Sequence, residues 1–161
     1  MKKILALSLV GILALSSCGK PKESPTPAAT TTPSTASLAS CYVAHLANDE
    51  YSIEITSQSD GLVKGNIYIH NAEKDSSYGA FTGALLEDQL LGTYDFWSEG
   101  TLSHSEIIFK FENGKLYRGF GPSTQEGEMS SFVRPLSITW DRSYAFEPAA
   151  KCPVAPTPAL K

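Results

Sequence analysis

Apolar and polar residues alternate along most of the chain between residues 41 and 141. In the stretch 50–56, for example, Tyr51, Ile53 and Ile55 share one side, and polar residues occupy the positions between them. A period of two is typical of a β-strand with one buried face. The alternation predicts about eight strands, over 41–46, 50–56, 62–71, 78–86, 90–97, 106–112, 115–121 and 132–141.

The predicted strands are short, consecutive and joined by turn sequences such as Asn113-Gly114, which favours a tight hairpin. Neighbouring strands should therefore pair in an antiparallel meander. Helix signals are nearly absent between residues 41 and 152, so no helix is available to cover the buried face. An all-β fold is expected, as a small closed or partly open barrel, with a two-layer β-sandwich as the alternative.

The amino-terminal 18 residues have a different pattern. A cationic start, Met1-Lys2-Lys3, precedes a run of twelve apolar or small residues over 4–15, which is too short to span a bilayer. The four residues 15–18, Leu-Ser-Ser-Cys, resemble the bacterial lipobox. That resemblance implies removal of residues 1–17 as a signal peptide and acylation of Cys18 with diacylglycerol and a fatty acid such as palmitate.

Gly19, rather than Asp, follows the cysteine, which for lipoproteins implies an outer-membrane anchor facing the periplasm or the cell surface. An ordinary secretory signal that leaves Cys18 as a plain thiol is the alternative. Proline, threonine and serine dominate 18–40, so this segment is expected to be a disordered tether, and 153–161 a similar tail. A single folded domain is then expected over 41–152.

Three cysteines occur in the chain, and Cys18 is assigned to lipid. The other two, Cys41 and Cys152, bracket the predicted domain. In an oxidising compartment this arrangement predicts one disulfide that joins the first and last segments. A metal-binding pair or a reactive thiol are the rival interpretations, but no CxxC motif supports either.

The formal net charge is −4, and the charges are scattered. No basic face for nucleic acid is therefore expected. The three histidines, His45, His70 and His104, lie on separate segments without a metal-binding spacing, so neither a metal nor a cofactor is predicted.

Residues able to do chemistry are concentrated in "YDFWSEGTLSHSE", residues 94–106. A carboxylate, an imidazole and a guanidinium backed by aromatic rings could bind a small polar ligand or transfer protons at the mouth of a barrel. A structural alternative is that Glu99 caps its turn and pairs with Arg118 or Lys110, while Trp97 packs under a loop. The candidate binding residues are Tyr94, Trp97, Glu99, His104 and Arg118.

A longer pattern spans about 50 residues, from 71 to 121. It reads AEKD, GxFxG, LxGxYxFxSEG, a segment ending in FK, and GxG, and it resembles a group of small bacterial lipoproteins of unassigned function. The matching residues are Ala72 to Asp75; Gly79, Phe81 and Gly83; Leu91, Gly92, Tyr94, Phe96 and 98–100; Ser105, Phe109, Lys110, Gly119 and Gly121. Trp97 departs from the pattern, where a small polar residue is usual. The resemblance implies a lipoprotein and a barrel, and no substrate.

These observations together favour a monomeric, non-enzymatic module of the cell envelope that binds a small apolar molecule or an envelope protein. Its contact with the membrane is expected through the lipid on Cys18. The alternative is an envelope hydrolase, or another enzyme, that uses Glu99 and His104.

Overall fold

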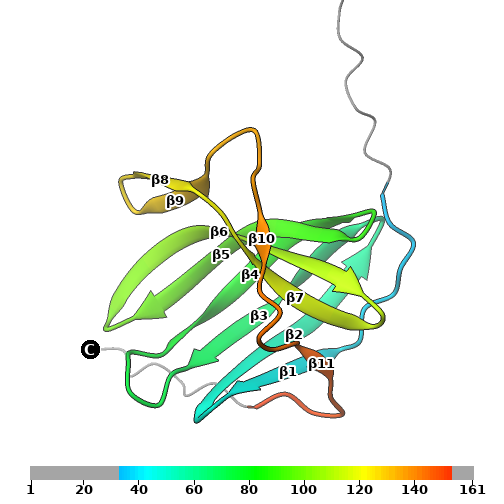
Figure 1. Ribbon diagram of the computed structural model, residues 1–161, viewed down its shortest axis with the longest axis horizontal. Coiled ribbons are helices and arrows are strands. Elements are labelled where there is room, and N and C mark those ends of the chain that lie inside the picture. Colours follow the sequence, from blue (N-terminus) through cyan, green and yellow to red (C-terminus); the bar gives the residue numbers. More distant parts are fainter. Residues whose placement is uncertain (1–32, 154–161) are drawn as a thin grey trace, which may run out of the picture.

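The computed structural model describes residues 33–153, and these form one curled β-sheet without helices (Figure 1). The signal peptide, Cys18 and most of the tether and tail lie outside the described residues. The strands are β1 (Cys41–Leu46), β2 (Asp49–Ser59), β3 (Leu62–His70), β4 (Ser77–Leu86), β5 (Gln89–Ser98), β6 (Thr101–Glu112), β7 (Lys115–Phe120), β8 (Ser123–Glu126), β9 (Met129–Phe132), β10 (Thr139–Trp140) and β11 (Glu147–Pro148).

The all-β fold and the antiparallel meander are confirmed, because β1 to β7 pair in sequence order. The hydrogen-bonded path runs β10-β7-β6-β5-β4-β3-β2-β1-β11, and the β8–β9 hairpin joins it through a short parallel pairing of β9 with β6. The described residues therefore form a single mixed sheet. They do not form the two-layer sandwich that was the alternative.

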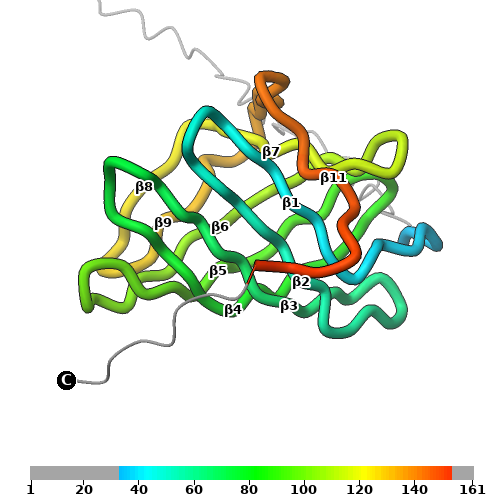
Figure 2. Tube along the Cα trace, turned by 90° about the horizontal axis from the view of Figure 1, so that it is seen from below, coloured from blue at the N-terminus to red at the C-terminus, as the bar shows by residue number. Residues whose placement is uncertain are grey.

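The expected closed barrel is wrong, because no ladder joins the two ends of the path. The sheet curls until the segment before β11 approaches β7 (Figure 2), but only Phe146 and Leu116 pair there, through reciprocal backbone hydrogen bonds of 2.9 and 3.0 Å. The next strand, β11, has two residues, and Pro148 has no N–H to donate. The seam is thus one residue pair wide.

The expected number of eight strands is also too low. Seven of the predicted strands are present as β1 to β7, but the eighth, over 132–141, is divided. Its first residue ends β9, Pro135 follows a cis peptide bond, and only Thr139–Trp140 pairs with β7. The preceding polar segment forms the hairpin β8–β9, which the alternation could not predict because its strands bury no apolar face.

The concave face of the curled sheet holds the core. The alternation predicted the inward residues correctly from β2 to β6, because those positions carry the buried side chains. Tyr42, Phe81 and Phe109 are the largest side chains among those that are fully buried. We call the opposite side of the sheet the convex face.

The described part of the predicted tether, 33–40, lies against the sheet. The Ser34 N–H donates to the carbonyl of Leu85, and the Leu38 N–H donates to Oε1 of Gln58 at 3.0 Å. Leu38 also packs on the core. The folded unit therefore begins several residues before Cys41.

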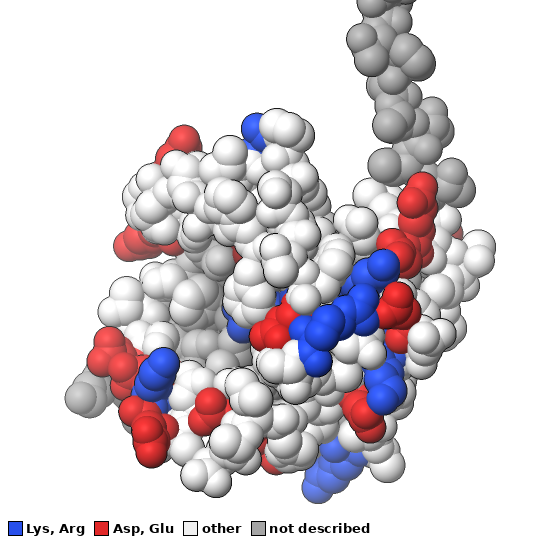
Figure 3. Space-filling view, viewed as in Figure 1, with Lys and Arg blue, Asp and Glu red and all other residues white. Residues whose placement is uncertain are grey.

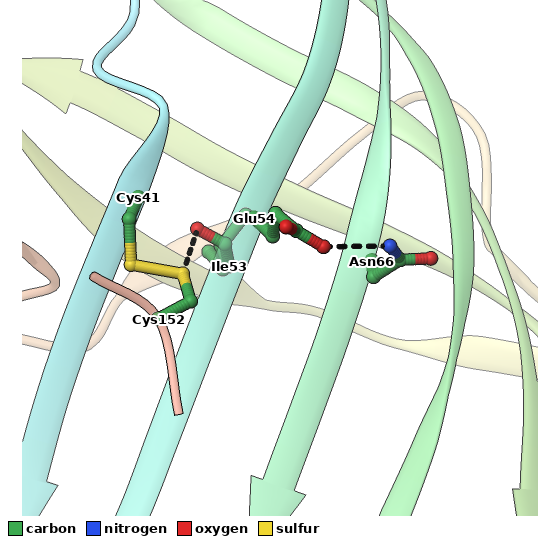
Figure 4. Close-up of a disulfide and its surroundings, with 5 residues drawn as sticks. All are labelled: Cys41, Ile53, Glu54, Asn66 and Cys152. Carbon is green, nitrogen blue, oxygen red and sulfur yellow. Dashed lines mark hydrogen bonds between the residues drawn. A yellow bond between two sulfur atoms is a disulfide. The ribbon is translucent and has the colours of Figure 1, made fainter. Parts of the chain in front are cut away.

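The disulfide between Cys41 and Cys152 is confirmed, with the two Cα atoms 5.5 Å apart (Figure 4). It joins the start of β1 to the segment just after β11. The β11 strand itself already pairs with β1. The Sγ atom of Cys152 lies 3.5 Å from the carbonyl oxygen of Ile53. Because a disulfide sulfur carries no proton, this approach is a packing contact.

Candidate functional site

The five candidate residues from the sequence divide between the two faces of the sheet. Tyr94 belongs to the core on the concave face, where its hydroxyl donates to the carbonyl of Ile67 and lies 3.2 Å from the hydroxyl of Ser77. Burial raises the pKa of Tyr94 to about 12. A hydroxyl that stays neutral and is hydrogen-bonded within the protein stabilises the core and is not available to bind a ligand.

Glu99 occupies the first position of the two-residue turn between β5 and β6. It has a φ of 50°, and Gly100 follows with 77°, as a type I′ hairpin turn requires. Its carboxyl group lies beside that of Asp75, which raises the pKa of Glu99 through a shared hydrogen bond and charge repulsion. Glu99 is thus engaged with Asp75 at the hairpin tip, away from the other candidates.

His104 projects from the convex face, and its Nδ1 atom lies 2.7 Å from Oδ1 of Asp95. Arg118 lies opposite Phe109 in the ladder of β6 and β7, so it projects from the concave face. His104 and Arg118 are therefore on opposite sides of the sheet. Glu99, His104 and Arg118 do not meet in one cleft.

Trp97 has a large open groove beside it on the convex face, and this groove is the strongest candidate site. Tyr68 lies directly opposite Tyr78 in the ladder of β3 and β4, and Tyr78 lies directly opposite Trp97 in the ladder of β4 and β5. We call these three residues the aromatic row. Adjacent strands are about 4.8 Å apart, so the row extends about 10 Å across the sheet.

A second row runs parallel to the first, two residues along each strand. Glu54 lies opposite Asn66, Asn66 opposite Ala80, and Ala80 opposite Asp95. We call Glu54, Asn66 and Asp95 the polar row. Two residues of a strand span about 7 Å, so a ligand on the aromatic row is within reach of the polar row.

The polar row is held in place by its own hydrogen bonds. Nδ2 of Asn66 donates to Oε2 of Glu54 at 2.8 Å, as Figure 4 shows, and His104 holds Oδ1 of Asp95. Within the described residues, the second oxygen of each carboxylate and the amide oxygen of Asn66 make no protein hydrogen bond. Fixed acceptors therefore face the groove, and the small residue Ala80 leaves room between Asn66 and Asp95.

The carboxy-terminal segment forms one side of this groove. Residues 150–153 line it and are fixed to the sheet by the disulfide, while Trp97 and Leu102 line the opposite side. The groove encloses about 840 Å³. Its volume is within the range of known ligand sites, and it is partly open to solvent.

Sequence reasoning found Trp97 and His104 but missed Tyr68, Tyr78 and the polar row. The sequence does contain a signal for the aromatic residues, at the positions of each strand that face away from the core. Tyr68, Tyr78 and Trp97 are large aromatic residues at positions that a half-buried strand normally gives to polar side chains. Only the register of the strands reveals that these three positions adjoin.

No cluster of three or more metal-ligating side chains occurs between Pro33 and Pro153. The same part of the chain contains no helix that is long and apolar enough to cross a membrane. Comparisons with models of protein families, with curated proteins and with solved structures found no match to this chain.

Proposed function

We propose that this protein is a non-enzymatic binding module of the cell envelope whose convex groove takes a carbohydrate chain. The observation that carries the proposal is the aromatic row lying parallel to the polar row on one open face of the sheet. The resemblance to small lipoproteins and the lipobox-like residues at Cys18 support an anchor in the outer membrane.

Sugar rings have two chemically different aspects. Their C–H faces are apolar and pack on aromatic rings, whereas their hydroxyl groups lie at the ring edge and require hydrogen-bond partners. The groove offers both kinds of partner side by side. Trp97 is 39% exposed, so a stacking surface is available without rearrangement of the core.

The carboxylates and the amide of the polar row suit neutral sugars or amino sugars. Each carboxylate can accept from hydroxyl groups, and Asn66 can accept through its oxygen while its nitrogen stays with Glu54. Because these side chains are already oriented by partners, little conformational freedom is lost on binding. An acidic glycan is disfavoured by Glu54 and Asp95, which face the same groove.

The geometry favours a glycan over other ligands. An aromatic cage for a quaternary amine encloses its ligand, but these three rings lie in a line on an open sheet. A peptide that extends the sheet needs a strand edge, whereas the groove lies over the face of β2 to β6. The alternative of an enzyme using Glu99 and His104 has no support from their separate positions.

Binding can be tested with the purified protein and three probes: isolated peptidoglycan, chitin oligosaccharides and dextran. A Trp140→Phe background leaves Trp97 as the only tryptophan, so its fluorescence reports on the groove. Trp97→Ala and Tyr78→Ala, in pull-down or affinity electrophoresis, are each expected to weaken binding about tenfold. Leu62→Ala is the matched control, because Leu62 is an exposed apolar residue on the same face, outside the groove.

Failure of all three probes, or equal losses in Trp97→Ala and Leu62→Ala, would refute the glycan proposal. A synthetic peptide with the sequence of residues 153–161, PVAPTPALK, provides a further check. If the peptide quenches Trp97 and the saccharides do not, the groove is a proline-rich peptide site. The anchor is tested separately, because Cys18→Ala should move the protein from the membrane fraction to the soluble fraction.

A further inference from the structure

Burial on the concave face decreases toward one end of the sheet. Along β7 the inward residues are Leu116, Arg118 and Phe120. Leu116 is fully buried, Arg118 is half-buried and Phe120 is 47% exposed. The inward residues Tyr51, at the start of β2, and Phe96, at the end of β5, are likewise only partly buried. The core is therefore filled at one end and open at the end where β7 finishes.

The open end of the concave face forms a hollow. In the space-filling view this side is hollowed beneath the β8–β9 hairpin (Figure 3). Aromatic side chains gather there, since the ring centres of Tyr51 and Tyr144 are 5.4 Å apart and Phe96 stacks on Tyr94. We call this region the hollow, and its inward side chains are Tyr51, Ile69, Phe96, Arg118, Phe120 and Tyr144.

Arg118 supplies the positive charge of the hollow. The chain has three arginines, and the other two are paired, Arg134 with Glu106 and Arg142 with Glu112. No carboxylate of the described residues pairs with Arg118, although its side chain is half-buried. A half-buried guanidinium without a counter-ion is costly unless a ligand or water satisfies it.

Aromatic side chains hold the guanidinium of Arg118 in place. Its central carbon lies 5.0 Å from the centre of the Phe120 ring, and it donates a hydrogen bond to the hydroxyl oxygen of Tyr144. These contacts orient a guanidinium and leave most of its N–H groups free to donate. Because Tyr144 accepts this bond through its oxygen, its own proton is also available to a ligand.

The tyrosines around Arg118 do not neutralise its charge. That charge reaches the hydroxyl groups of Tyr51, Tyr94 and Tyr144. Burial raises the pKa of Tyr51 and of Tyr94 to about 12, and it also raises the pKa of Tyr144. All three hydroxyl groups are therefore uncharged at neutral pH, and the hollow keeps a positive centre.

We propose that the hollow binds a small organic acid whose carboxylate pairs with Arg118 and whose apolar body lies against the aromatic side chains. The two oxygens of a carboxylate match two parallel N–H groups of one guanidinium. The partly exposed rings of Phe96 and Phe120 offer apolar surface on the same face.

Charge favours a monoanion in this position. A single negative charge neutralises Arg118, whereas a dianion such as a phosphate monoester would leave an uncompensated charge in a half-buried place. Acidic residues near the opening, such as Glu99, are exposed at hairpin tips, where solvent and salt screen them. The ion pair with Arg118 is screened less, because the guanidinium is half-buried.

This site is independent of the proposed glycan groove. The groove lies on the convex face, and none of the six side chains of the hollow lines it. Trp97→Ala should therefore weaken glycan binding and leave acid binding unchanged. Failure of either proposal can thus be recognised separately.

The test measures binding of naphthalene-2-carboxylate and octanoate by calorimetry, using the full chain with Cys18→Ala so that no detergent is needed. Naphthalene-2-methanol and octanol are the uncharged counterparts. Arg118→Gln is expected to weaken binding of the effective acid at least about tenfold, and Phe120→Ala by a smaller factor. Arg142→Gln is the matched control, because it removes the same positive charge from a paired, exposed position.

Binding of the naphthalene acid alone identifies an aromatic ligand body, and binding of octanoate alone an aliphatic one. Either result supports the proposal if Arg118→Gln loses it and Arg142→Gln retains it. Equal losses in the two arginine variants, equal binding of an acid and its alcohol, or no binding of either acid would overturn the site.

A second pair of variants keeps the test decisive if Arg118→Gln does not fold. Phe120 and Leu62 are similarly exposed, at 47% and 49%, but Leu62 lies on the convex face. Phe120→Ala should weaken acid binding and Leu62→Ala should not. Equal effects of these two substitutions would also overturn the proposal.

Discussion

Removal of the disulfide should lower the stability of the whole domain. Cys41 and Cys152 are 111 positions apart, and the chain-entropy estimate for closing a loop of this length is about 5 kcal/mol. Natural domains are stable by only about 5–15 kcal/mol. We therefore expect the double variant Cys41→Ala/Cys152→Ala to lose about 3–5 kcal/mol of unfolding free energy.

The structure indicates why little else replaces this bond. Between Phe146 and Pro153, the chain contacts the rest of the backbone through one bridge to Leu116, the two-residue ladder of β11, and the Ala149 N–H, which donates to the carbonyl of Cys41 at 3.0 Å. If the disulfide acts mainly by restricting the unfolded chain, its removal should destabilise the whole domain. The slow-exchanging amides in β4 to β6 should then lose as much protection, in free energy, as the domain loses in unfolding free energy. If it acts only locally, the loss should be confined to β1 and 146–153.

Urea denaturation followed by tryptophan fluorescence measures the effect, with Cys18→Ala in both proteins so that only the disulfide differs. Wild-type protein in reductant should behave like the double variant. A loss below about 1 kcal/mol, or a protection change limited to the ends of the chain, would refute the reasoning from loop closure.

Three further outcomes are expected. Phe146→Ala should cost about 3–5 kcal/mol in the same urea assay, because the side chain is 2% exposed and packs edge-on against Phe109 with ring centres 5.6 Å apart. The raised pKa of Tyr94, about 12, means that its contribution to stability is complete below pH 10 and is lost as pH rises towards 12, so unfolding titrations of Tyr94→Phe should show a weaker alkaline loss. Arg134 lowers the pKa of Glu106, so that contribution is present above pH 4.5 and disappears as pH falls further; Glu106→Gln should lack this acid-dependent step when stability is followed through acidic pH.

Local patterning was enough to predict which residues face the core. Ile53 was placed on the inward side of its strand by the period of two, because the alternation along one strand is a property of its own sequence, and Ile67 and Phe109 in the core follow the same alternation. Asn113-Gly114 likewise identified its hairpin, since both residues adopt positive φ there. The disulfide followed from the position of two cysteines.

Closure of the sheet and the groove depended on relations between distant segments. The alternation does not report how far the ends of a sheet approach, and the single pair of Phe146 and Leu116 has no counterpart in the local pattern. Tyr68 and Tyr78 become neighbours only through the register of β3 and β4. Arg118 was recognised as chemically important, but only the folded structure shows that no carboxylate between residues 33 and 153 pairs with it.

The bond between Cys41 and Cys152 also has a mechanical consequence. If the chain is tethered at its amino end and pulled from its carboxy end, tension reaches these two residues before it reaches most of the sheet. The disulfide then carries the load. The two cysteines are 111 positions apart, so the 110 residues between them are not stretched. The groove, whose strands lie inside this closed loop, should keep its shape while the protein is under force.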